Sequence, residues 1–212
     1  MNGVWFDDIH SFNDLNLILS DVEIPPAEPK TNFVEITGGD GFADLTEALG
    51  EVRYGSRVPT FTFTVLPEDD FEEKKREVSN LLNGKRCKRL VLDKDPDYYW
   101  EGRLAVDNYA SNKRVHTIVV KATVNPYKLR ISQTRVIVRA GQTTVQLVRS
   151  GRKTAIPTFT CKAQTTVIFN GTKYTIQAGT FKLLDIALAE GSNYITITST
   201  NTVEITYQEG DL

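Results

Sequence analysis

The sequence predicts a mainly β protein of two domains with a single α-helix. Short segments rich in β-branched and aromatic residues recur along the chain, separated by Gly, Pro, Asn and Asp. One segment, at about residues 68–83, has clear helical spacing. A long β-branched segment ends at Asn125-Pro126, where the sign of the charge also reverses. We therefore expect an N-terminal domain over residues 1–127 and a C-terminal domain over residues 128–212.

Composition and charge narrow the class of protein. The 212 residues are 40% hydrophobic and 25% charged, which is typical of a soluble globular protein. Residues 1–127 carry 15 Lys and Arg against 22 Asp and Glu, whereas residues 128–212 carry 10 against 5. The net charge of −2 gives no reason to expect nucleic-acid binding by the whole surface. No signal peptide and no apolar run of membrane-spanning length is seen, so we expect a soluble protein made in a cytoplasm.

In the N-terminal domain, apolar and β-branched groups predict strands at 4–6, 15–19, 33–36 and 58–66. In the last of these, Phe61, Phe63 and Val65 alternate with threonines, which indicates a half-buried strand. Three prolines at 25–29 and the glycines at 38–41 interrupt regular structure before it. Further strands are expected at 89–92, 98–104 and 115–124, with a turn at 93–97.

The predicted helix has acidic residues in its first turns, and Lys85 and Arg86 follow its end, as the helix dipole favours. Phe71, Val78 and Leu82 form a narrow apolar stripe that can pack on a sheet. Gly84 suits the left-handed position that ends a helix.

The C-terminal domain is predicted to be a sandwich or barrel of short strands. Asn170-Gly171 is a strong signal for a two-residue hairpin turn. Only Lys182 to Ala189 has a pattern that suggests a second helix. The expected strands cover residues 136–138, 143–148, 159–162, 166–169, 173–177, 194–199 and 203–207.

No catalytic, cofactor-binding or metal site is predicted, and the protein is not expected to be an enzyme. His10 and His116 have no ligand residues at metal-binding spacing, apart from two aspartates beside His10. Cys87 and Cys161 are expected to be reduced and to pack as small hydrophobic residues. No local motif joins either cysteine to a histidine as a nucleophile pair.

Three other groups have features of binding sites. Asp93, Asp95 and Asp97 begin like a calcium loop, but Tyr and Leu stand where that loop requires Gly and Glu. The basic run 85–89 could meet phosphates, although a helix end followed by a solvated loop explains it better. The C-terminal domain lacks Trp, so a sugar site there would depend on tyrosines such as Tyr174 or Tyr194.

Five segments, in order, resemble the distal tail protein (Dit) family of long-tailed bacteriophages, the siphophages. They span roughly residues 1–129 and are Gly3-Val4-Trp5-Phe6-Asp7-Asp8-Ile9 with Asp14-Leu15-Asn16-Leu17, Gly38-Gly39-Asp40-Gly41-Phe42-Ala43-Asp44-Leu45-Thr46, Tyr54-Gly55-Ser56-Arg57-Val58-Pro59-Thr60-Phe61-Thr62-Phe63, Asp97-Tyr98-Tyr99-Trp100-Glu101-Gly102-Arg103-Leu104, and Pro126-Tyr127-Lys128-Leu129.

The resemblance implies an N-terminal β-sandwich or barrel with one helix, six copies of which close into a ring. The ring would join the tail tube protein to the tail-associated tip protein and let DNA pass through its lumen without specific binding. A C-terminal galectin-like β-sandwich would lie outside the ring and dock a receptor-binding or other tail protein. The protein would then be part of a virion, encoded by a phage or a prophage and made in the host cytoplasm.

Two alternatives stay open on the sequence. A tail tube protein also combines a β-barrel with one helix, but it would stack into long tubes. A carbohydrate-binding or adhesion module would instead bind glycans through its tyrosines.

Overall fold

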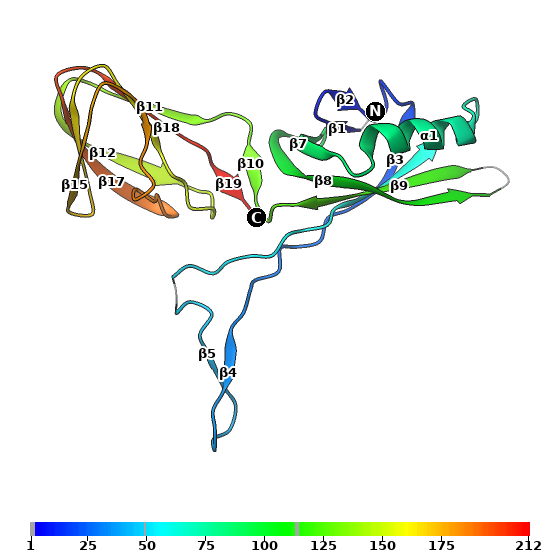
Figure 1. Cartoon of the computed structure of the whole chain (residues 1–212), viewed down its shortest axis with the longest axis horizontal. Coiled ribbons are helices and arrows are strands. Elements are labelled where there is room, and N and C mark those ends of the chain that lie inside the picture. The colour runs from blue at the N-terminus through cyan, green and yellow to red at the C-terminus, as the bar shows by residue number, and fades with distance from the viewer. Residues whose placement is uncertain (1–2, 49, 113–114) are drawn as a thin grey trace. The chain divides into compact units, whose positions relative to one another are not determined.

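The computed structural model describes residues 3–48, 50–112 and 115–212 (Figure 1). Strands make up most of these residues, together with one α-helix, so the predicted fold class is confirmed. The chain forms two compact units, residues 1–126 and 127–212, and each has its own hydrophobic core. In the described part of the chain, no helix is long and apolar enough to cross a membrane.

The first unit is built on one antiparallel sheet that curls around its core. Its strand order is β2-β1-β7-β8-β9-β6-β3. Phe6 on β1 lies against Phe61 and Phe63 on β6, with ring centroids 6.2 and 6.3 Å apart. Since three strands separate β1 from β6 in the sheet, this contact shows that the sheet folds back on itself. The strands are β1 (Val4–Phe6), β2 (Ile9–His10), β3 (Leu17–Glu23), β6 (Thr60–Val65), β7 (Arg86–Leu92), β8 (Asp95–Ser111) and β9 (His116–Val124).

Helix α1 (Phe71–Leu82) closes this core. Val78 and Leu82 are fully buried, as the predicted stripe required. The helix begins three residues later than predicted because Asp70 is extended and caps it, accepting hydrogen bonds from the amides of Glu72 and Glu73. Gly84, with a φ of 73°, is left-handed just after the helix end.

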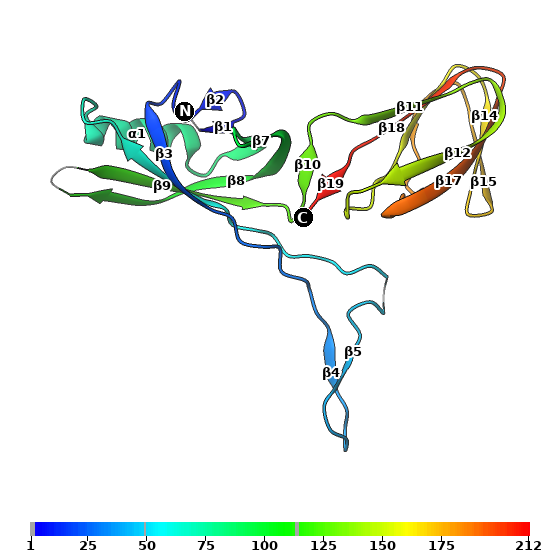
Figure 2. The ribbon, with the colours of Figure 1, turned by 180° about the vertical axis from the view of Figure 1, so that it is seen from behind.

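A long arm, residues 24–56, leaves the sheet between β3 and β6 (Figures 1 and 2). Near its tip, β4 (Phe33–Glu35) and β5 (Phe42–Asp44) form a two-stranded sheet of their own. Neither core cluster includes an arm residue. The arm is therefore ordered by its own backbone pairing rather than by burial against the unit that carries it.

The second unit is a sandwich of two four-stranded antiparallel sheets, β11-β18-β13-β16 and β12-β17-β14-β15, with β10 and β19 paired beside them. Asn170 and Gly171 have positive φ values and join β14 to β15, as predicted. The strands are β10 (Lys128–Arg130), β11 (Thr134–Val138), β12 (Gly141–Arg149), β13 (Thr158–Cys161), β14 (Thr165–Phe169), β15 (Thr172–Ile176), β16 (Gly179–Lys182), β17 (Gly191–Ser199), β18 (Val203–Tyr207) and β19 (Gly210–Asp211).

The suggested helix at Lys182 to Ala189 is wrong. Lys182 ends β16, and the following residues form an irregular segment in which Ile186 and Leu188 are fully buried. Their spacing of two suits an extended segment, and the backbone of Leu188 bridges to Ala155. Tertiary burial of this segment overrides its weak helical pattern.

The buried guanidinium of Arg149 anchors the same segment. It donates to the carbonyl oxygens of Leu188, Gly151 and Lys153, and its Nη2 lies 3.3 Å from a carboxylate oxygen of Glu209. Both side chains are almost fully buried. A buried charge needs such partners, so this network holds three loops of the sandwich together.

Candidate interaction surfaces

Among the described residues, no group of three or more His, Cys, Asp and Glu side chains is placed to hold a metal ion. Asp93, Asp95 and Asp97 do not lie together in a calcium-binding loop. The turn is only two residues long, because Asp95 already pairs with Leu92 in the hairpin of β7 and β8. Asp93 faces the N-terminal strands instead.

His10 and Asp93 join the first hairpin to the turn that follows β7. Nδ1 of His10 accepts hydrogen bonds from the amides of Phe12 and Asn13, which leaves Nε2 to donate to Asp93 at 3.1 Å. Asp93 also accepts from the amide of Gly3 and the indole of Trp5. Burial alone would raise the pKa of Asp93, but these hydrogen bonds outweigh it and lower the pKa.

The two cysteines and His116 also pack as structural residues. Burial raises the pKa of the Cys87 thiol to about 11, and the charge of Asp7 adds to the effect. A thiol with that pKa is protonated at neutral pH and therefore a poor nucleophile. Cys161 is buried in the other core. His116 stacks on Phe71, 4.6 Å between ring centroids, and hydrogen-bonds Ser111.

The basic run is part of a strand, not of the predicted loop. Cys87 and Leu90 of β7 point into the core, while Arg86, Lys88 and Arg89 are exposed. Arg86 stands directly opposite Arg103 of β8, and like charges in that position repel. Arg89 lies over the ring of Tyr99, and Trp5 is exposed on the neighbouring strand β1. We call these six side chains, Trp5, Arg86, Lys88, Arg89, Tyr99 and Arg103, the basic face.

The tip of the arm carries charge of the opposite sign to that of the basic face. Residues 31–48 contain four acidic side chains, Glu35, Asp40, Asp44 and Glu47, and no Lys or Arg. Between them are large apolar side chains that are half exposed or more, including Phe33 at 52% and Phe42 at 59%. The two rings touch edge to face, with centroids 4.6 Å apart. The tip of the arm is thus both acidic and apolar.

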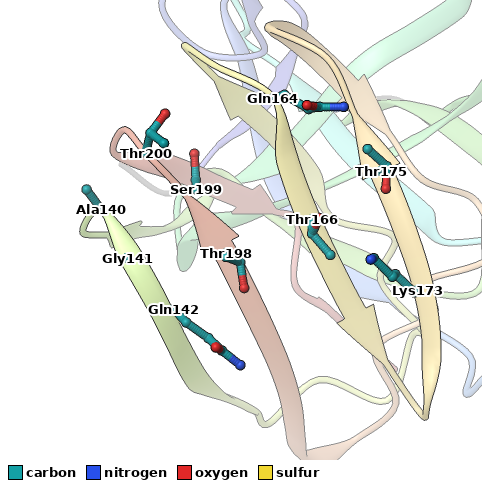
Figure 3. Close-up of a pocket in the computed structure, with 10 residues that line it drawn as sticks. All are labelled: Ala140, Gly141, Gln142, Gln164, Thr166, Lys173, Thr175, Thr198, Ser199 and Thr200. Carbon is teal, nitrogen blue, oxygen red and sulfur yellow. The ribbon is translucent and has the colours of Figure 1, made fainter.

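The second unit has an open hollow of about 800 Å³ on its β12-β17-β14-β15 sheet (Figure 3). Gln142, Thr198, Thr166 and Thr175 come from four neighbouring strands, and Lys173 supplies a cation. Its polar groups are hydroxyls and amides, which suit a polar ligand. Tyr194 is 59% exposed on β17, whereas Tyr174 packs against the core.

Residues 9–125, more than half of the chain, match the family described as the phage tail protein RIFT-related domain. The chain belongs to this phage tail protein family. The matched residues include the whole arm and all of the basic face except Trp5. Both surfaces therefore belong to the phage tail domain itself.

Among solved structures, the chain is similar to the crystal structure of SPP1 Dit (gp 19.1), described as a paradigm of the hub adsorption apparatus in phages that infect Gram-positive bacteria. The match covers 100% of both chains with a TM-score of 0.72 and 14% identity. A de novo designed double-stranded β-helix covers 38% of this chain with a TM-score of only 0.26. No curated protein matches. The expected membership of the distal tail protein family is confirmed, with the Dit fold extending over the whole length.

The sequence analysis missed the surface of the arm, and it placed the basic run in a loop rather than on the strand β7. The apolar residues at 33–36 were expected to form an ordinary strand, yet Phe33 and Val34 are exposed. The dense alternation of apolar and acidic residues around the 38–41 glycines was the available signal. For the basic face, the signal was Cys87 between Arg86 and Lys88, an apolar residue at strand spacing within a charged run.

Proposed function

We propose that this chain is a structural virion protein, a distal tail component that forms a hexameric ring at the baseplate hub. The ring connects the tail tube to the tail-tip and receptor-binding apparatus. The observation that carries this proposal is the similarity of fold to the SPP1 Dit hub protein over both complete chains. Membership of the phage tail protein family supports it independently. In this role the protein is not an enzyme.

The two units divide this work. Residues 1–127, which contain the phage tail domain, form the ring. Residues 128–212 form a galectin-like sandwich outside it and dock other tail proteins. The separate cores support this division, because each unit is able to stay folded while its surface meets a different partner.

DNA passes through the lumen of the ring without specific binding. The net charge of −7 over residues 1–127 supports this, since cationic side chains would hold phosphates strongly. The protein is made in the cytoplasm of the host bacterium and functions in the virion at the tail tip.

Native mass spectrometry of the purified full chain, combined with negative-stain images, tests the ring. We expect hexamers that appear as single closed rings or as stacked pairs. Long tubes would instead identify the chain as a tail tube protein, because a tube subunit continues to stack. A chain that stays monomeric at millimolar concentration and is absent from purified tails would overturn the proposal.

A second function, glycan binding by the sandwich, is favoured by one observation, the hydroxyl- and amide-lined hollow on the sheet whose strand β17 also carries the exposed Tyr194. We propose a glycan array on the full chain, with Tyr194→Ala and Lys173→Ala as site variants and Tyr174→Phe as the matched control. Binding that is lost in both site variants and kept in the control would support it. An array without signal would rule out this second function for the glycans tested.

A further inference from the structure

We propose that the acidic tip of the arm docks on the basic face of a second copy of this chain. This inference rests on the proposed ring and specifies which surfaces hold it together. A ring of identical chains requires a head-to-tail contact between two different patches of the same molecule. The arm tip and the basic face are such a pair.

The arm needs a covering partner. A two-stranded hairpin is marginally stable alone in water, and β4 with β5 is such a hairpin outside both cores. Phe33, Val34, Ile36 and Phe42 are between 46% and 59% exposed. Apolar side chains grouped in this way on a projecting segment mark a protein contact rather than an ordinary solvated loop.

The charges of the two surfaces indicate that the arm tip binds the basic face of another copy. The tip carries four carboxylates and no cation over residues 31–48. On the basic face, Arg86, Lys88, Arg89 and Arg103 are exposed, and none of them is in an ion pair within the described chain. The direct Arg86 and Arg103 pair is unfavourable until carboxylates approach it. Glu35 or Asp44 from a neighbouring arm would relieve that repulsion.

The apolar parts also match. Glu35 and Asp44 share one face of the hairpin with Phe33 and Phe42, because each strand places alternate residues on the same side. The basic face combines its cations with Trp5 and Tyr99. Trp, Tyr and Arg are the residues most often found at the energetic centre of protein interfaces. One face of the arm thus offers aromatic rings and carboxylates to a surface of aromatic rings and cations.

Charge-reversal variants of the full chain test the pairing. Glu35→Lys with Asp44→Lys alters the arm, and Arg86→Glu with Arg103→Glu alters the basic face. We expect each pair alone to raise the concentration needed for half-assembly by at least about tenfold, and the four changes together to restore assembly. Arg139→Glu with Lys162→Glu changes the net charge equally on the second unit, at exposed residues outside the hollow, and is the matched control.

A disulfide between copies tests the contact even where assembly is weak. One preparation carries Glu35→Cys and the other Arg103→Cys, and the native thiols stay shielded because Cys87 and Cys161 are buried. Mixed with oxidised glutathione, the two proteins should form a covalent dimer through the introduced thiols. Thr175→Cys replaces Arg103→Cys in the control and should give no dimer. Peptide mass spectrometry under non-reducing conditions identifies the linkage.

The outcomes separate the two proposals. Rings that form normally in all charge variants, without the disulfide, overturn the arm contact and leave the ring intact. A specific disulfide in a chain that never closes into rings supports the arm contact and removes the support for the hexamer. Absence of both rings and disulfide overturns the arm contact.

Discussion

At the scale of single residues, two pairs of polar side chains, each with a buried member, hold the fold together. His10 and Asp93 join the first hairpin to the turn after β7, and Arg149 with Glu209 joins loops of the sandwich. In both cases each partner satisfies a polar group that would otherwise be costly to bury. The sequence shows such residues but not their partners, since Asp93 lies 83 positions from His10 and Glu209 lies 60 from Arg149.

Asp93→Asn is expected to destabilise the first unit by about 1 kcal/mol at neutral pH, because it weakens three hydrogen bonds to a carboxylate. The pKa of Asp93 is lower in the folded chain than its ordinary value of 3.8. Its stabilising effect is therefore complete above that value and is lost as the pH falls through the folded pKa. Denaturant unfolding followed between about pH 7 and about pH 2 should show the variant and the parent converge in acid. A difference in the free energy of unfolding that stays constant with pH would contradict the stabilising role of the Asp93 carboxylate.

Arg149→Met is expected to cost about 3–5 kcal/mol, because it leaves the Glu209 carboxylate buried without its cation. Adding Glu209→Gln should recover part of the loss, since no buried charge then remains. Arg152→Met is the matched control, because its ion pair with Glu190 is exposed and should be worth at most about 1 kcal/mol. If chemical unfolding shows that Arg149→Met and Arg152→Met lower the free energy of unfolding equally, the role given to the buried network is refuted.

At the scale of elements, short-range patterns predicted most of what depends on neighbours in sequence. The alternation at 60–65, the stripe of α1 and the Asn170-Gly171 turn are all confirmed. Predictions failed where contacts between residues far apart in the sequence determine the local structure. The segment after Lys182 is extended because Ile186 and Leu188 fill the sandwich core, and β10 with β19 pairs residues about 80 positions apart.

Gly102→Ala is expected to weaken the pairing of β8 with β9. A Cβ at this position would lie 2.2 Å from the carbonyl oxygen of Thr123, so the backbone of one strand must move. We expect a loss of about 1–3 kcal/mol, the usual range for overpacking. Gly55→Ala is the control, because its nearest contact would be an ordinary 3.7 Å. If both variants have the same midpoint of thermal unfolding, the close approach of β8 and β9 at Gly102 does not limit the stability of the fold.

At the scale of the whole molecule, the chain has two cores with no shared residue. Both tryptophans, Trp5 and Trp100, belong to the first unit, so their fluorescence reports on that unit alone. This allows the stability of each unit to be followed separately in the intact chain.

We expect Arg149→Met to leave the tryptophan fluorescence transition unchanged while it lowers the midpoint of a second transition seen by calorimetry. Gly102→Ala should do the reverse. The reason is that each substitution perturbs only the core to which it belongs. A single transition that moves with either substitution would show that the two units unfold together.

The acidic side chains of the arm have one more consequence, for solubility before assembly. Exposed hairpins with apolar side chains are sites where identical chains aggregate edge to edge. Here Glu35, Asp40 and Asp44 are interspersed with the apolar residues, so two arms that approach one another bring like charges together. These carboxylates act as gatekeepers, which keep free copies apart at this exposed apolar hairpin.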